Sequence, residues 1–152
     1  MLELSSYLTP QQIILSHYNT KKEVLTELAT MLAEQLKYDA AAMVNAVFER
    51  EGLMSTGIGH GLAVPHVRLE GLAEPALAVS VQPAGISDYE SLDSMPVAVI
   101  VLIAAPAGQH EMYIRLLAQV ADVLKRDELR EKVIAAATRG EADTVFKILT
   151  GK

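Results

Sequence analysis

The sequence contains no cysteine among its 152 residues. That absence excludes a disulfide framework, a thiol nucleophile and a cysteine-based zinc site, and it is compatible with a reducing cytosol. The sequence also lacks an apolar run of the roughly 18–20 residues that span a bilayer. Its longest apolar run covers residues 96–107, and its first residues lack the basic start and apolar stretch of a signal peptide. Together these absences predict a cytoplasmic protein.

Basic residues are outnumbered, since 13 Lys and Arg face 19 Asp and Glu, for a formal net charge of −6. Nucleic-acid binders usually carry a basic patch, so that class of protein is not expected. Apolar residues make up 51% of the chain and charged residues 21%, as in ordinary globular proteins. A chain of this length buries about two-thirds of its unfolded surface without a disulfide or structural metal. No linker, repeat or low-complexity segment interrupts it, so we expect one domain over residues 1–152.

Several motifs of common enzyme classes are missing. No serine occupies a Gly-x-Ser-x-Gly elbow, no Gly-Lys-Ser/Thr phosphate loop occurs, and the helical His-Glu-x-x-His zinc motif is absent. Glycines alternate at Gly57, Gly59 and Gly61, which is not the Gly-x-Gly-x-x-Gly fingerprint of dinucleotide-binding folds. A Rossmann fold is therefore not indicated.

Hydrophobic periodicity and capping signals predict five helices and at least three strands. Thr20 and Glu23 fit a capping box at the first helix start, and Asp39 fits the N-cap of the second. The expected helices cover residues 20–37, 40–50, 109–126, 127–138 and 141–149. The expected strands cover residues 13–15 (an edge strand), 76–82 and 96–104, and residues 52–61 are expected to form a loop. The strand at 96–104 is apolar at consecutive positions, as in a central strand buried on both faces.

The most informative stretch is residues 48–66, which reads Phe-Glu-Arg-Glu-Gly-Leu-Met-Ser-Thr-Gly-Ile-Gly-His-Gly-Leu-Ala-Val-Pro-His. It resembles the enzyme IIA domains of the fructose–mannitol type, from the bacterial phosphoenolpyruvate-dependent sugar phosphotransferase system. The pattern of that family is Arg-Glu, a short spacer, Ser/Thr-Gly-Ile-Gly, a polar residue and Gly-Ile/Leu-Ala-Ile/Val-Pro-His. The resemblance continues more loosely through the strand ending at Pro106 and the helix opened by His110, so it covers nearly the whole chain.

The resemblance implies a fold and a set of site residues. The fold is an α/β domain with a mixed central β-sheet and helices on both faces. The phosphorylated nucleophile falls on His66, the second active-site histidine on His110, and the arginine before the glycine loop on Arg50. The loop residues expected near the site are Thr56, Gly57, Gly59, His60 and Gly61, and Ser55 and Thr56 are candidate hydroxyl donors. No metal or small-molecule cofactor is required.

Two positions depart from the family pattern. Val67 stands where the family often has glycine directly after the phosphorylated histidine, and His60 stands where the glycine loop often has asparagine. Both departures bear on partner specificity and on the hydrogen bonding of the loop, and neither removes the nucleophile.

The chemistry of these residue types suits a phosphocarrier. A neutral imidazole attacks phosphorus at neutral pH and later leaves again, provided that an acceptor, such as a backbone carbonyl, holds its other nitrogen in the right tautomer. Phosphoryl transfer through a loose in-line transition state depends mostly on positioning and electrostatics. His110 at a helix start would hydrogen-bond the phosphoryl oxygens, and Arg50 would add a fixed positive charge nearby.

Each of these residues also has a plainer interpretation. His66 could be a structural histidine after Pro65, His110 an exposed residue at a helix start, and Arg50 a solvated cation near a helix C-terminus. His60 is more simply a loop residue that takes no part in phosphoryl transfer, and His17 is structural or exposed. A zinc site built from His60, His66 and His110 lacks a carboxylate partner at a suitable spacing.

The resemblance implies a protein-histidine phosphotransferase component that accepts phosphate on His66 from phospho-HPr or a relative. It would pass the phosphate to a cysteine of a sugar-transporting IIB domain, with peripheral association at a membrane transporter. The alternative is a free-standing regulatory module of the nitrogen-related IIA type, which binds target proteins according to its phosphorylation state. A phosphate-binding α/β protein without phosphotransfer is a third possibility.

Overall fold

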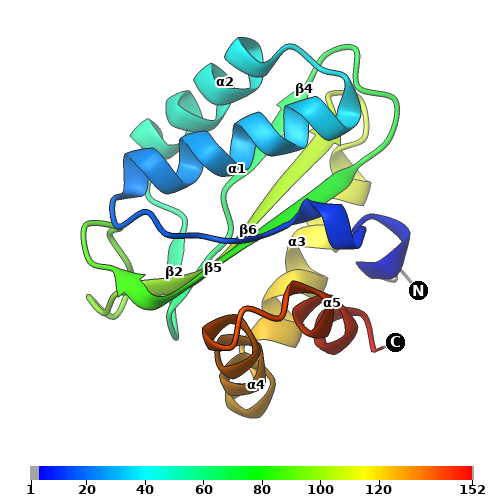
Figure 1. The fold of residues 1–152 in the computed structure, drawn as a ribbon. Coiled ribbons are helices and arrows are strands. Elements are labelled where there is room, and N and C mark those ends of the chain that lie inside the picture. Colours follow the sequence, from blue (N-terminus) through cyan, green and yellow to red (C-terminus); the bar gives the residue numbers. More distant parts are fainter. Residues whose placement is uncertain (1–3, 152) are drawn as a thin grey trace.

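A computed structural model describes residues 4–151, which form a mixed six-stranded sheet between two layers of helices (Figure 1). The strands are β1 (Ile13–Leu15), β2 (Gly57–Gly59), β3 (Leu62–Ala63), β4 (His66–Leu69), β5 (Ala76–Ile86) and β6 (Val97–Pro106). The α-helices are α1 (Lys21–Leu36), α2 (Ala40–Leu53), α3 (His110–Leu124), α4 (Asp127–Thr138) and α5 (Ala142–Thr150). Short 3-10 turns at Leu4–Ser6 and Pro10–Gln12 precede β1. No helix of the described residues is long and apolar enough to cross a membrane.

The sheet is built around β5 and β6. Its order is β1-β5-β6-β3-β2, and β4 pairs with β6 off this path. The β5–β6 and β2–β3 pairs are antiparallel, whereas β1–β5, β3–β6 and β4–β6 are parallel. This arrangement confirms the mixed sheet and the edge position of residues 13–15.

Alternate residues of the two central strands, β5 and β6, pack into two separate hydrophobic cores, one on each face of the sheet. Val79, Val101 and Ile103 pack under α3, α4 and α5, whereas Ala78 and Leu102 pack under α1 and α2. Successive side chains of a strand point to opposite faces, so a strand covered on both faces needs apolar residues at every position. The continuous apolar run of β6 is therefore explained by the two helical layers that Figure 1 shows, one on each face of the sheet.

The predicted N-caps of α1 and α2 are confirmed. The Thr20 side chain accepts a hydrogen bond from the backbone N–H of Glu23, and the Asp39 carboxylate accepts one from Ala42 N at 2.9 Å. These caps satisfy backbone donors that have no partner inside the helix. The bounds of all five helices agree with the sequence prediction to within three residues.

The predicted loop over residues 52–61 is wrong in part. Helix α2 continues to Leu53, and Gly57–Gly59 pairs with Leu62–Ala63 as a tight hairpin. Tertiary contacts that local sequence patterns do not encode stabilise both elements. Glu51 at the end of α2 is buried, with 7% of its surface exposed, and Gly57 forms an additional β-bridge with Ser91. The two central strands run longer than predicted, to Ile86 and Pro106.

Candidate functional site

His66 stands where a strand is interrupted beside the centre of the sheet. Leu62 pairs with Val99 on β6, and His66 pairs with Ile103 four residues further on. Between these pairs Pro65 has no N–H to donate, while its carbonyl accepts a hydrogen bond from Ile103 N at 2.9 Å. The interruption lets the chain follow β6 as two short strands, with the imidazole at the start of the second.

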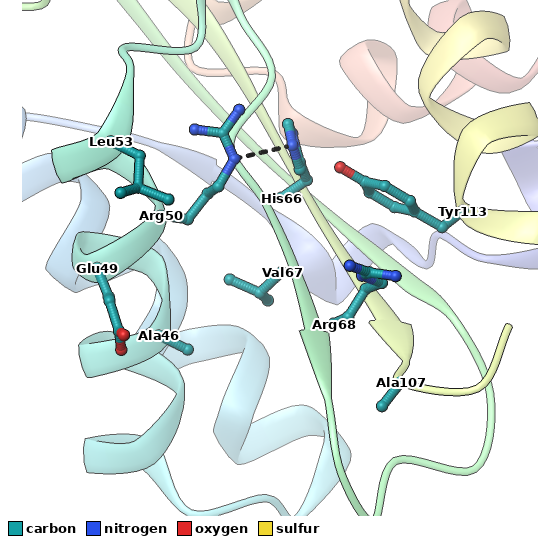
Figure 2. Close-up of a pocket in the computed structure, with 9 residues that line it drawn as sticks. All are labelled: Ala46, Glu49, Arg50, Leu53, His66, Val67, Arg68, Ala107 and Tyr113. Atoms are coloured by element: carbon teal, nitrogen blue, oxygen red, sulfur yellow. Dashed lines mark hydrogen bonds between the residues drawn. The ribbon is translucent and has the colours of Figure 1, made fainter. Parts of the chain in front are cut away.

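The backbone fixes which nitrogen of the His66 ring carries the proton. Nδ1 lies 2.8 Å from the carbonyl oxygen of Val64. A carbonyl only accepts hydrogen bonds, so Nδ1 is the donor and Nε2 holds the free lone pair. Nε2 accepts a hydrogen bond from Nε of Arg50 at 3.2 Å (Figure 2).

The surroundings keep this ring uncharged. Burial lowers the pKa of His66 below its ordinary value of 6.5, and the positive charges of Arg50 and Arg68 lower it as well. The Val64 carbonyl and the Glu51 carboxylate act in the opposite direction without reversing the shift. At neutral pH the half-buried ring is therefore a nucleophile with Nε2 available.

Arg50 is held in place by the end of its own helix. It lies in the last turn of α2, and its Nη1 donates to the carbonyl of Met54 at 2.9 Å. This bond uses one edge of the guanidinium, so that Nε faces His66. The predicted proximity of Arg50 and His66 is observed in the structure.

A hollow of about 570 Å³ opens in front of the ring. The His66 hollow, as we call it, is lined by Ala46, Glu49, Arg50, Leu53, His66, Val67, Arg68, Ala107 and Tyr113. Figure 2 shows Arg50 and Tyr113 on opposite sides of the His66 ring, with Arg68 beside Tyr113. The ring centroids of His66 and Tyr113 are 5.1 Å apart. Two guanidinium groups and a neutral nucleophile make this a suitable receptor for a tetrahedral anion.

His110 opens helix α3 and does not line the His66 hollow. It lies in a neighbouring hollow of about 400 Å³ with Gln109 and Arg115. Its Nδ1 is 2.9 Å from Nη1 of Arg68, and its ring centroid is 6.2 Å from that of Tyr113. Arg68 and Tyr113 thus connect the two histidines.

The glycine-loop residues do not line the His66 hollow. Thr56 is buried, and its hydroxyl donates to the Glu51 carboxylate. Gly57 packs so closely on a neighbouring loop that a Cβ there would lie 2.3 Å from the carbonyl oxygen of Glu90. Gly59 and Gly61 have positive φ in the hairpin turn. Ser55 Oγ donates to Glu90 O at 2.6 Å.

His60 sits at the exposed tip of this hairpin, with its backbone in the left-handed region at φ 59°. Its backbone N–H donates to the Asp93 carboxylate at 3.0 Å. Its ring takes no part in lining the His66 hollow. His17 is likewise exposed. Within residues 4–151, no group of three or more His, Asp or Glu side chains could hold a metal ion.

A buried polar cluster under the site was not predicted. Glu51 accepts hydrogen bonds from the hydroxyls of Thr56 and Tyr89, the latter at 3.0 Å, and from Thr56 N at 3.2 Å. Lys21 Nζ lies 3.0 Å from Glu51 and 4.5 Å from the centroid of the Tyr89 ring. Burial and the Glu51 charge raise the pKa of Tyr89, so its hydroxyl stays a donor. The cluster joins α1 to the residue directly after Arg50.

The sequence also did not lead us to predict Arg68 and Tyr113 as site residues. Arg68 lies two residues after His66 on β4, which places both side chains on one face of the strand. Tyr113 lies three residues after His110 on α3, one helical turn away. Applying these two periodicities to the candidate histidines would have identified both residues.

Comparisons with known proteins agree with this architecture. Residues 6–150 match the family described as "Phosphoenolpyruvate-dependent sugar phosphotransferase system, EIIA 2". The chain is 33% identical over 151 residues to a nitrogen regulatory protein of Pseudomonas aeruginosa, across 98% of this chain and 96% of that one. It is 34% identical over 150 residues to the fructose-specific EIIABC component of Bacillus subtilis, across 97% of this chain and 23% of that larger protein.

A solved structure shares the whole fold. The nitrogen regulatory protein IIA-Ntr from Neisseria meningitidis superposes with a TM-score of 0.83 at 25% identity, over 95% of this chain and 97% of that one. The fold and the family match make this chain a phosphoryl carrier. It belongs to the EIIA 2 family of the phosphoenolpyruvate-dependent sugar phosphotransferase system. The resemblance drawn from residues 48–66 is thereby confirmed, as is the α/β fold.

Proposed function

We propose that His66 is the residue that carries the phosphoryl group, and that Nε2 is the nitrogen that reacts. The observation that supports this most directly is the pair of bonds on the ring. Nδ1 is engaged by the Val64 carbonyl, and Nε2 faces Arg50 at the edge of the hollow. A neutral imidazole with one nitrogen anchored and the other directed at cationic donors is suited to in-line attack on phosphorus.

The transfer conserves atoms and charge without a cofactor. The Nε2 lone pair forms a bond to phosphorus while the phosphorus–nitrogen bond of a donor phosphohistidine breaks, and that electron pair returns to the donor ring. Nδ1 of His66 keeps its proton, so the phosphorylated ring carries a positive charge that the Val64 carbonyl stabilises. Arg50 exchanges its bond to Nε2 for one to a phosphoryl oxygen. The reverse sequence passes the group on to the next acceptor.

Arg50 and His110 contact the incoming anion in this proposal. Arg50 lines the His66 hollow and supplies positive charge to the equatorial oxygens. His110 accepts a hydrogen bond from Arg68 and donates to an oxygen of a phosphoryl group on His66. The loop residues act from outside the His66 hollow, where Thr56 and Gly57 fix the backbone around the Val64 carbonyl.

The donor in this proposal is an HPr-like phosphocarrier in the cytoplasm, as the family resemblance implies. The acceptor is a IIB domain, and the Bacillus subtilis relative, described as an EIIABC component, supports that acceptor. A second candidate is regulation of target proteins by the phosphorylation state of the chain. It is favoured by the match to the Pseudomonas aeruginosa nitrogen regulatory protein over nearly the full length of both chains.

Labelling tests the proposal. Incubation with phosphoenolpyruvate, enzyme I and HPr should give an acid-labile, base-stable phosphate on the wild-type chain. His66→Ala should abolish the label, whereas His17→Ala, a change at an exposed histidine away from the hollow, should retain it. A label that persists on His66→Ala would remove the assignment. Loss of label on adding a IIB domain and sugar-transport membranes favours transport, whereas a stable label with state-dependent protein binding favours regulation.

A further inference from the structure

Arg68 stands at the boundary between the His66 hollow and the hollow that contains His110. It lies on β4 and lines the His66 hollow, and its Nη1 reaches the His110 ring on α3 at 2.9 Å. The sheet and the helix that carry the two histidines are thus joined by one side chain.

The chemistry of this contact fixes the His110 proton. A guanidinium carries five N–H donors and no acceptor, and it stays charged at any physiological pH. Nδ1 of His110 must therefore be the acceptor in its bond with Arg68. The proton of the neutral ring is then confined to Nε2, which is left free to donate elsewhere.

The aromatic ring of Tyr113 lies near Arg68 and both histidines. Its centroid lies 6.0 Å from Cζ of Arg68, 6.2 Å from the His110 ring and 5.1 Å from the His66 ring. Tyr113 is 9% exposed, whereas the three groups near it are exposed or half-buried. The guanidinium of Arg68 and the imidazole of His110 both lie near the buried ring of Tyr113, which limits the orientations open to each.

We propose that Arg68 is a positioning residue that holds the His110 ring as the Nε2–H tautomer and aims that donor toward the phosphoryl group. The role of His110 as the donor rests on the proposed function, whereas the tautomer assignment does not. Without the guanidinium, either nitrogen of His110 could carry the proton and the exposed ring could rotate, so part of the protein would present an acceptor to an anion.

The first test reads the tautomer directly in the unphosphorylated protein. Nitrogen-15 shifts and ring couplings of His110 should show Nδ1 as an unprotonated acceptor in the wild-type chain. In Arg68→Met the Nδ1 signal should move and report a mixture of tautomers. Arg115→Met is the matched control, because Arg115 is an exposed arginine that lines the His110 hollow and pairs with Glu111. It removes the same charge and should leave the His110 signals in place.

The second test is a double-mutant cycle on the rate of phosphorylation by phospho-HPr. Arg68→Met should lower the rate about tenfold, the factor expected for one charge-assisted hydrogen bond. If Arg68 acts through His110, the double variant Arg68→Met/His110→Ala should be no slower than His110→Ala alone, to within about twofold. Circular dichroism spectra and melting curves should establish that each variant is folded.

Three results would overturn the proposal. They are a proton found on Nδ1 of His110, His110 signals unchanged in Arg68→Met, and additive effects in the cycle, which would assign Arg68 a direct action on the phosphoryl group. If the wild-type chain takes no label at all, the proposed function fails, while the tautomer measurement still decides the contact between Arg68 and His110.

Discussion

Arg50 donates from Nε to Nε2 of His66 over 3.2 Å, so in the resting protein the Nε2 lone pair is occupied by the guanidinium that we propose stabilises the phosphoryl group. We predict that Arg50→Met lowers the phosphorylation rate about a hundredfold, the usual loss for one preorganised donor to a developing charge. Stopped-flow transfer from phospho-HPr measures this rate. Arg115→Met should leave it within about twofold, and equal losses in the two variants would contradict a specific role for Arg50.

The pH dependence of His66 provides a second prediction. Burial, Arg50 and Arg68 lower the pKa of His66, so the ring should titrate below 6.5 and remain neutral at pH 7. Arg50→Met removes one lowering influence and should raise the midpoint. Following the ring C–H signals of His66 by NMR against pH measures both values. A wild-type midpoint above 6.5, or a lower midpoint in the variant, would contradict the electrostatics.

The same shift makes stability depend on pH. The unfolded chain binds a proton at His66 near pH 6.5, whereas the folded chain binds one only at lower pH. The contribution of His66 to the free energy of unfolding should therefore fall as pH falls through 6.5 and level off below the folded pKa. Urea unfolding between pH 7.5 and 5 measures it. His66→Gln should flatten this part of the profile, and an unchanged profile would contradict the linkage.

The buried cluster under the site should be important for stability. Tyr89→Phe removes a hydroxyl that donates to the Glu51 carboxylate at 3.0 Å in a site where Tyr89 is 2% exposed. We expect a loss of about 2 kcal/mol in the free energy of unfolding, because the bond is buried and charge-assisted. Tyr38→Phe is the control, since the Tyr38 hydroxyl donates to the Glu70 carbonyl in an exposed position. It should cost less than about 1 kcal/mol, and equal losses would contradict a special role for the cluster.

Gly57 should tolerate no side chain. A Cβ there would lie 2.3 Å from Glu90 O and 2.9 Å from Ser91 Cα, both backbone atoms that cannot move alone. Gly57→Ala should therefore cost about 3 kcal/mol. Gly52→Ala, in the last turn of α2 with nothing within 4 Å of a Cβ, should instead stabilise the protein by up to about 1 kcal/mol. Thermal unfolding of the pair measures the contrast, and similar melting temperatures would refute it.

The sequence predicted those parts of the structure that local patterns encode. Helix caps at Thr20 and Asp39 and the two-sided burial of β6 follow from short-range signals, and the structure has them all. The end of α2 and the β2–β3 hairpin were missed because contacts across the fold, from Lys21 and Ser91, stabilise them. The position of His110 outside the His66 hollow likewise depends on how α3 packs on the sheet, which no local pattern specifies.

The acceptor for Nδ1 of His66 is a main-chain carbonyl that the interruption at Pro65 leaves free of the ladder. Every amino acid supplies such an oxygen, so no replacement of Val64 by another residue can delete it. Side chains at the rim of the His66 hollow can therefore be changed without changing which nitrogen of the His66 ring carries the proton. In the function that we propose, a change of docking partner and a constant reactive nitrogen are compatible, because side chains form the rim and the main chain supplies the acceptor.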